Sequence, residues 1–340
     1  MRTEEFDYEL PDAAIAQAAI EPRDAARLLV TSSMEDRTFR DLPAILNPGD
    51  LVVVNRTRVR SARLAGHKPA TGGAVELLLL RRLDTERWEA LIRPARRIRP
   101  GVPLEFGGIA GEVLSAPADG MVTVRLTTQI GDVEDLLPSA GEVPLPPYFH
   151  GRLDDPERYQ TVFAKTVGSA AAPTAGLHFT PEVIAQLGMR GVELAEVDLE
   201  VGLDTFRPMS VEEIEEHRIH RERYDVPEEV AAAVAETRRS GGRVVAIGTT
   251  VIRTLETAAC GEGLVRAGDG ESTLFVKPGY RMAVVDAAIT NFHAPRTTLI
   301  ALVAAMLGPV WREVYATALN RGYRFLSFGD AMVIDRPVNR

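Results

Sequence analysis

The hydrophobic pattern changes twice along this chain. Before residue 63, short apolar runs at 27–31 and 51–54 predict strands, and the Pro-Asp pair that opens 11–20 predicts a helix. Between 63 and 147, short β-rich runs follow one another closely, and glycine or proline marks every junction. Regular short strands of this kind are typical of a small all-β barrel or sandwich.

After residue 159, helical and strand patterns alternate. The patterns predict helices at 183–189, 227–240, 251–260, 297–307 and 310–320, and strands at 191–197, 243–247 and 286–289. Alternating elements of this kind favour an α/β architecture. We therefore predict a mixed α/β domain built from both chain ends, residues 1–62 and 148–340, with an all-β barrel domain inserted at 63–147.

The bulk composition agrees with a globular chain of two domains. The chain has 340 residues, of which 45% are hydrophobic and 26% are charged. Its longest apolar run, 299–307, is far shorter than the roughly 18 residues that a membrane span needs. No signal peptide is visible at the N-terminus, and Cys260 is the single cysteine, which excludes an intrachain disulfide. We expect a cytoplasmic protein that has no contact with a membrane.

Two arginine clusters are candidates for contact with RNA. The first contains Arg93, Arg96, Arg97 and Arg99 in the expected barrel, and the second contains Arg56, Arg58, Arg60 and Arg63. A net charge of −9 argues against a sequence-blind nucleic-acid coat, but it leaves room for a local basic groove. Isolated charge runs are more often solvated surface, and this alternative stays open.

Two loops of small residues each carry a histidine. Pro173, Thr174, Ala175 and Gly176 precede His178, and Asn291 and Phe292 precede His293. Small residues let backbone N–H groups approach a ligand closely, and a neutral imidazole can move a proton. These loops are expected to form the walls of one site, although each could also be a tight packing turn.

A third candidate is the junction of the 243–247 strand with the helix that follows. Gly248, Thr249 and Thr250 occupy the N-terminus of that helix, where free N–H groups suit a carboxylate or a phosphate. Ordinary helix capping is the alternative. Arg253 is a further binding candidate, although it could simply pair with Glu256 on the same helix face.

His217 and His220 are three residues apart, so on a helix they would share one face. Proton transfer is the favoured role, and a surface position is the alternative. Two histidines without a third ligand are weak grounds for a metal, so no metal site is expected. P-loop, dinucleotide-binding, nucleophile-elbow and zinc-protease motifs do not occur in the sequence.

These motifs together resemble a known family. The block 171–180 is similar to the most diagnostic block of the S-adenosylmethionine:tRNA ribosyltransferase-isomerases of queuosine biosynthesis. Further blocks follow in the family's order at 6–11, 62–64, 159–164, 205–208, 248–256, 278–280, 290–293 and 323–332. The resemblance covers nearly the whole chain and implies an α/β domain interrupted by a β-barrel.

The resemblance also implies a reaction. The ribosyl unit of S-adenosylmethionine is transferred to 7-aminomethyl-7-deazaguanine in a tRNA anticodon and isomerised to epoxyqueuosine, with release of adenine and methionine. S-adenosylmethionine is then a co-substrate, and we expect neither another cofactor nor an obligate protein partner. The base that removes a proton beside the sulfonium is expected to be His178 or His293, with His217 and His220 as further candidates. Asp330 or one of the histidines is the candidate proton donor to adenine. The Gly248 turn could hold the methionine carboxylate.

Three positions depart from the family pattern. Glu200 stands where the family usually has histidine, Asp204 where it has glycine, and Arg56 where it has aspartate. These changes leave two alternatives open. One is a divergent paralogue that acts on another acceptor, such as a free deazapurine. The other is a catalytically silent module that binds an adenosyl ligand or RNA.

Overall fold

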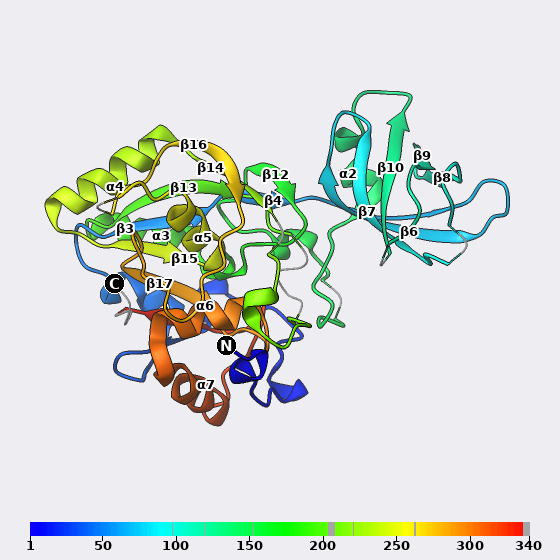
Figure 1. The fold of residues 1–340 in the computed structure, drawn as a ribbon. Coiled ribbons are helices and arrows are strands. Elements are labelled where there is room, and N and C mark those ends of the chain that lie inside the picture. Colours follow the sequence, from blue (N-terminus) through cyan, green and yellow to red (C-terminus); the bar gives the residue numbers. More distant parts are fainter. Residues whose placement is uncertain are drawn as a thin grey trace. The chain divides into compact units, whose positions relative to one another are not determined.

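A computed structural model describes residues 1–96, 98–118, 120–151, 153–202, 208–219, 221–261 and 263–335. The chain divides into two compact units. One comprises Met1–Thr57, Pro146–Thr166 and Ala172–Arg340, and the other comprises Arg58–Leu145 and Val167–Ala171. We call them the α/β unit and the barrel unit. The mixed α/β fold with a β-barrel that the sequence predicts is therefore confirmed (Figure 1).

A mixed nine-stranded sheet forms the centre of the α/β unit. Its strand order is β16-β14-β13-β3-β15-β17-β18-β1-β2. Neighbours from β13 to β17 run parallel, β18 runs antiparallel to β17, and β1 runs parallel to β18. The strands are β1 (Arg27–Val30), β2 (Glu35–Thr38), β3 (Leu51–Asn55), β13 (Glu193–Leu199), β14 (Glu222–Val226), β15 (Val244–Ile247), β16 (Gly268–Ser272), β17 (Ala287–Asn291) and β18 (Ala331–Ile334).

Both faces of this sheet are buried. Along β15, Val244 and Ala246 belong to one hydrophobic core, whereas Val245 and Ile247 belong to a second. This period of two is expected when both faces of a strand are covered, and it explains the continuous apolar run in the sequence. Helices α4 (Glu228–Ser240), α5 (Thr249–Thr257), α6 (Thr298–Leu307) and α7 (Trp311–Asn320) supply the first core, and α1 (Leu42–Ile45) and α3 (Pro181–Met189) supply the second (Figure 1).

The barrel unit is a closed antiparallel barrel. Its sheet runs β11-β5-β6-β7-β10-β9-β8, and a pairing between β5 and β8 closes the ring. Trp88, Phe106 and Ile109 are completely buried in its core. The elements are β5 (Arg63–His67), β6 (Ala74–Arg82), β7 (Arg87–Arg93), β8 (Pro103–Phe106), β9 (Ile109–Val113), β10 (Met121–Thr128), α2 (Val133–Ala140) and β11 (Gly141–Glu142).

Short elements complete the described fold. β4 (Thr57–Val59) and β12 (Thr166–Ser169) form a two-stranded sheet. The 3-10 helices are η1 (Thr3–Phe6), η2 (Asp12–Ala14), η3 (Arg23–Ala25), η4 (Phe39–Asp41), η5 (Pro156–Tyr159), η6 (Thr174–His178), η8 (Ile214–Glu216) and η9 (Gly308–Val310).

The helix predicted at 11–20 is wrong. Only η2 forms there, and the chain then extends alongside Phe325. Ile15 forms a parallel bridge with Phe325, whose backbone N–H donates to the carbonyl of Ala14 and whose carbonyl accepts from the N–H of Ala16. Tertiary pairing with a distant segment therefore overrides the local helix signal.

One helical stretch, Thr298–Asn320, is long and apolar enough to cross a membrane by length and composition. Its apolar window is 67% buried inside the protein. The stretch consists of α6, η9 and α7, and core helices of this kind pass the same test.

Candidate functional site

Loops from distant parts of the chain meet at one edge of the central sheet. The parallel strands β13, β15 and β17 end in the same direction, so the residues that follow them, including Val201 and Gly248, lie at a common edge with Asn291. Because β18 runs antiparallel to β17, the segment that precedes it reaches the same edge, where Ala331 pairs with Asn291. In open α/β sheets, ligands bind outside the carboxyl ends of the parallel strands.

The structure has a cavity at this edge. Two adjoining hollows, with empty volumes of about 280 and about 340 Å³, share Thr174, Asn291, His293 and Leu299 in their walls. The first is also lined by Tyr148, Ala294, Thr297, Leu326 and Ser327, and the second by Ala172, Pro173, Ala175, Val201, Gly248, Thr249, Thr250 and Thr290. None of these lining residues carries a formal charge while histidine is neutral, so the part of the cavity wall that the described residues form is polar but uncharged.

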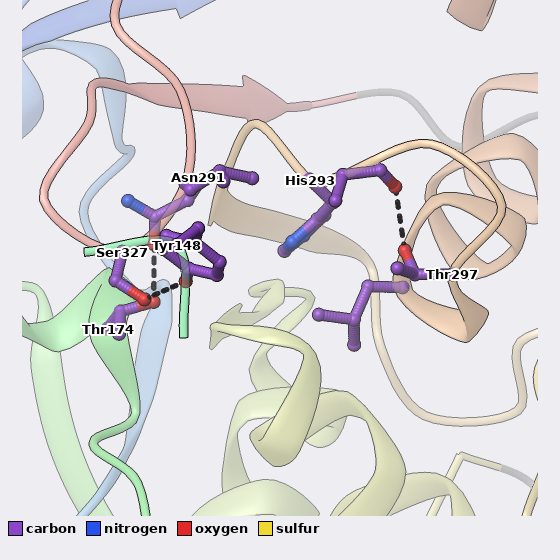
Figure 2. A pocket seen from close by; sticks show the side chains of 9 residues that line it. Tyr148, Thr174, Asn291, His293, Thr297 and Ser327 are labelled. Carbon is purple, nitrogen blue, oxygen red and sulfur yellow. Dashed lines mark hydrogen bonds between the residues drawn. The ribbon is translucent and has the colours of Figure 1, made fainter. Parts of the chain in front are cut away.

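His293 reaches directly into the cavity. Its Nε2 lies 2.9 Å from Oγ1 of Thr290, and its backbone is held by two tyrosines: Tyr8 Oη donates to its carbonyl at 2.6 Å, and its N–H donates to Tyr315 Oη at 3.1 Å. Burial lowers the pKa of His293 to about 3. The ring is therefore neutral at physiological pH, and in Figure 2 it extends from its loop toward the side that carries Asn291.

His178 lies behind the cavity. It is only 4% exposed and lines neither hollow. Its Nε2 lies 3.3 Å from Nδ2 of Asn291, whose Oδ1 accepts from Thr174 Oγ1 at 2.9 Å. Burial lowers the pKa of His178 to about 4, although the nearby Asp330 carboxylate opposes this shift. The two histidine loops are thus brought together, but His178 lines neither hollow and instead contacts Asn291, which lines both.

Asp330 is held by backbone and arginine contacts. Its Oδ1 accepts from the N–H of Arg27 at 3.0 Å and from Nη2 of Arg324 at 3.3 Å, and its Oδ2 accepts from the N–H of Arg324 at 2.8 Å. The side chain is buried and does not line either hollow. Its carbonyl accepts from Asn291 at 3.4 Å. These contacts suit a residue that fixes the loop before β18.

Seven of the ten predicted binding residues line the cavity: Pro173, Thr174, Ala175, Gly248, Thr249, Thr250 and Asn291. Gly176, Phe292 and Arg253 do not. A Cβ at Gly176 would lie 3.0 Å from Thr161, so this glycine permits close packing, and Phe292 is completely buried among aromatic rings of the core.

The sequence left open an ion pair between Arg253 and Glu256, but each of these side chains has other partners. Its guanidinium forms an ion pair with Glu222, and its Nε donates to the carbonyl of Leu274 at 3.1 Å. Glu256 instead accepts backbone N–H groups from Ala283, Val284 and Val285. Both charged side chains of α5 thus tie the helix to neighbouring loops.

His217 lies at the end of η8, with its ring 6.0 Å from that of Phe275, and it does not line the cavity. The backbone at His217 is extended, so the shared helix face that the sequence left open for His217 and His220 does not start from a helical residue. His220, Arg97 and Asp204 lie outside the described residues. In the part of the chain that the structure describes, no group of three or more His, Cys, Asp or Glu residues could hold a metal.

The sequence interpretation missed part of the cavity wall. Tyr148, which shares a hydrogen bond with Ser327, follows directly after Pro146 and Pro147 and stands in none of the motif blocks. Burial raises the pKa of Tyr148 to about 12, so this hydroxyl stays protonated. The other missed lining residues are Ala172, Val201, Thr290, Ala294, Thr297, Leu299 and Leu326. Ser327 and Thr290 stand inside two of the motif blocks, which was the available signal.

Three arginines of the first cluster stand at and after the end of β7 in the barrel unit. Arg93, Arg96 and Arg99 are exposed, while Ile98 between them is buried in the barrel core and anchors the loop. Among the residues described for this unit, none forms an ion pair with these three arginines, whereas most of the other barrel arginines are paired: Arg60, Arg81, Arg82, Arg87 and Arg125. The loop therefore offers unneutralised positive charge.

Comparison with known proteins identifies the family. The model of the family described as queuosine biosynthesis protein matches residues 3–334. The chain belongs to this family. It is 50% identical to the S-adenosylmethionine:tRNA ribosyltransferase-isomerase of Symbiobacterium thermophilum over 340 residues, which cover 98% of this chain and 100% of that protein. The enzyme of the same name from Moorella thermoacetica is also 50% identical, over 98% of this chain and 100% of its own length.

A solved structure in this family has the same architecture. The crystal structure of S-adenosylmethionine tRNA ribosyltransferase from Thermotoga maritima shares 38% sequence identity with the chain, with a TM-score of 0.54. The match covers 97% of this chain and 99% of that one. Membership of the queuosine biosynthesis family is thus supported by sequence and by fold.

The departures from the family pattern have local explanations where they are described. Arg56 donates from Nε to Asp198 Oδ2 at 2.6 Å, so its positive charge is neutralised within the α/β unit. Glu200 is exposed and does not line the cavity, although the next residue, Val201, does. Neither residue changes the charge of the cavity wall.

Proposed function

We propose that this protein transfers the ribosyl unit of S-adenosylmethionine to 7-aminomethyl-7-deazaguanine in tRNA and isomerises it, forming epoxyqueuosine-tRNA, adenine and methionine. Family membership over 3–334 supports the reaction class. The observation that carries the proposal is the uncharged cavity with one neutral imidazole in its wall. S-adenosylmethionine enters as co-substrate, and the reaction needs no further cofactor or obligate protein partner.

His293 is the proposed base. Removing a proton from the carbon beside the sulfonium requires an unprotonated acceptor in a site that excludes water. His293 meets both conditions, since it is 7% exposed and its pKa is far below physiological pH. Asn291 and His178 would hold the opposite wall in place through their shared hydrogen bond.

The hydroxyl pair of Tyr148 and Ser327 is the proposed proton donor to the departing adenine. The sequence suggested Asp330 for this role, but its carboxylate already accepts two backbone N–H groups and an arginine. Tyr148 keeps its proton at physiological pH and faces the cavity (Figure 2). A protonated hydroxyl in the wall can donate where a carboxylate cannot.

The exposed arginine loop of the barrel unit is the proposed contact with tRNA phosphates. Arg93, Arg96 and Arg99 present free cationic groups on an anchored backbone. Such groups bind the phosphate backbone without reading its sequence. The barrel unit would then bind RNA, while the α/β unit holds the reacting groups.

A single incubation tests the proposal. Purified protein is mixed with S-adenosylmethionine and tRNA that carries the 7-aminomethyl-7-deazaguanine base, and adenine release is followed. We expect release that depends on this tRNA. Turnover with a free deazapurine but not with tRNA would favour the paralogue, and ligand binding without adenine release would favour the silent module.

A further inference from the structure

The N-terminus of α5 lies in the cavity wall without a side-chain cap. Gly248 is the N-cap residue, and as a glycine it has no side chain that could accept a hydrogen bond from the first turn. The first N–H groups of an α-helix have no partner within the helix, and buried helix ends normally receive one from elsewhere. Thr249 and Thr250, which begin this helix, line the larger hollow, so the helix starts at the cavity wall.

A second, independent feature lies beside these N–H groups. Thr250 is 6% exposed, and among the described residues none offers a hydrogen-bond partner to its buried Oγ1. Buried hydroxyl groups are rarely left without a partner in native proteins. A hydroxyl group of this kind beside a cavity is therefore a candidate contact for a bound ligand.

The hydroxyl points toward the helix start. A Cβ placed on Gly248 would lie 3.7 Å from Thr250 Oγ1 and 3.5 Å from the Ala175 methyl group. Gly248 has φ = +86° and ψ = 159°, a backbone conformation that is essentially restricted to glycine. The absence of a side chain thus leaves an open cradle between the hydroxyl of Thr250 and the loop of Ala175.

We propose that this cradle binds the carboxylate of the methionyl end of S-adenosylmethionine, with Thr250 as the residue that selects donors bearing this group. The inference rests on the proposed function and adds a subsite to it. A helix N-terminus carries partial positive charge, and its N–H groups and the hydroxyl are all donors, so the chemistry fits an anion. No formal positive charge is present among the lining residues, so the helix supplies the complementary field.

The geometry links this subsite to the proposed base. The larger hollow contains both the α5 N-terminus and His293 in its wall. A donor whose carboxylate sits at Thr250 extends its sulfonium along the same hollow. Anchoring one end of the donor in this way orients the carbon that loses its proton toward the imidazole.

The test compares two donors in the complete protein with saturating precursor tRNA. The value of kcat/KM for adenine release is measured with S-adenosylmethionine and with decarboxylated S-adenosylmethionine. We expect Thr250→Val to lower kcat/KM for S-adenosylmethionine by about tenfold and for the decarboxylated donor by less than about twofold, because it removes one charge-assisted hydrogen bond. Thr250→Ser, which keeps the hydroxyl, should preserve the wild-type ratio between the two donors.

Thr257→Val is the matched control. Thr257 lies on the same helix, its hydroxyl bonds Ser272 at 2.7 Å, and it does not line the cavity. It should leave the donor ratio unchanged. The inference is overturned if Thr250→Val lowers kcat/KM equally for both donors or for neither. An inactive wild-type protein would overturn the proposed function itself, so the two failures are distinguishable.

Discussion

Nδ2 of Asn291 lies 3.3 Å from Nε2 of His178, which joins the two histidine loops of the site behind the cavity. The same amide accepts from Thr174 through Oδ1 and donates to the carbonyl of Asp330, so its orientation is fixed from three sides. Asn291 therefore presents a rigid polar wall to the cavity, while the two imidazoles differ in position: one lines the cavity and the other supports it.

The position of His293 predicts the largest loss of activity. Replacing it with asparagine should lower kcat for adenine release by about 10²- to 10⁴-fold, because a positioned base contributes this much to proton transfer. Thermal unfolding of the variant verifies that it folds. His217→Asn is the control, since His217 does not line the cavity, and it should keep near-wild-type activity. If kcat of the His293→Asn variant stays within about tenfold of the wild-type value, His293 is not the base.

The buried histidines predict a pH-dependent stability. The pKa of His178 is about 4 in the folded protein, against 6.5 as the ordinary value. Between these values the unfolded chain binds a proton at this site and the folded protein does not, so stability falls as the pH falls. The full contribution is present above about pH 6.5, and on the order of 3 kcal/mol is lost by about pH 4.

This dependence can be measured by denaturant unfolding between about pH 4.5 and 7.5. His178→Gln should flatten the slope of unfolding free energy against pH, by up to about one proton. Equal slopes in wild type and variant would show that His178 titrates normally in the fold. His67→Gln provides the comparison, because His67, the last residue of β5 in the barrel unit, has an exposed side chain.

The arginine loop predicts a selective effect on tRNA. The double change Arg96→Ala and Arg99→Ala should raise KM for tRNA, reduce the salt dependence of binding by about one phosphate contact per arginine, and leave KM for S-adenosylmethionine unchanged. Arg87→Ala serves as control, since Arg87 is already paired with Asp84. If the double variant binds tRNA with unaltered affinity, these arginines do not belong to the tRNA-binding surface.

Gly248 predicts a backbone effect. Gly248→Ala should lower the free energy of unfolding by about 1–3 kcal/mol, because alanine must adopt a backbone conformation that it rarely populates. Gly188→Ala in α3 should instead stabilise the protein by roughly 0.5–1 kcal/mol, since a Cβ there meets no atom within 4 Å. Urea unfolding of both variants compares them. If Gly248→Ala leaves the free energy of unfolding unchanged, the junction between β15 and α5 accommodates alanine without strain.

Replacement of Asp330 is expected to affect the stability of the protein more than its kcat. Asp330→Asn removes the ion pair with Arg324 and weakens two backbone contacts, so the free energy of unfolding should fall by about 2–3 kcal/mol. At temperatures where the variant is folded, kcat should change by less than about tenfold. If kcat instead falls by about 10³-fold while stability is unchanged, Asp330 is the better candidate for the proton donor to adenine.

The central strands could be predicted from the sequence because both of their faces are buried. β3 and β15 are continuous apolar runs, and they were found. The two outermost strands of the sheet, β2 and β16, were missed because they are polar, with the sequences EDRT and GDGES. Edge strands pair on one side only and often carry charge, so they lack the hydrophobic signal on which the prediction depends.

The site could be predicted only in part. Small residues and helix-start signals singled out the loops of Thr174, Gly248 and Asn291, and these residues line the same hollow. The sequence could not tell which side of each loop faces the cavity, so His178 and Phe292 were grouped with residues that line it. Tyr148 was missed because its contact with Ser327 joins residues 179 positions apart, and no local pattern encodes such a distance.

The strand β18, near the end of the chain, lies between β17 and β1, which begins at Arg27. The chain must therefore be synthesised as far as β18 before this part of the central sheet can close. Until then, Asn291 lacks the carbonyl of Asp330, and β1 lacks its parallel neighbour. The cavity is thus incomplete in a nascent chain that has not reached β18, even though β1 and β17 have already been made.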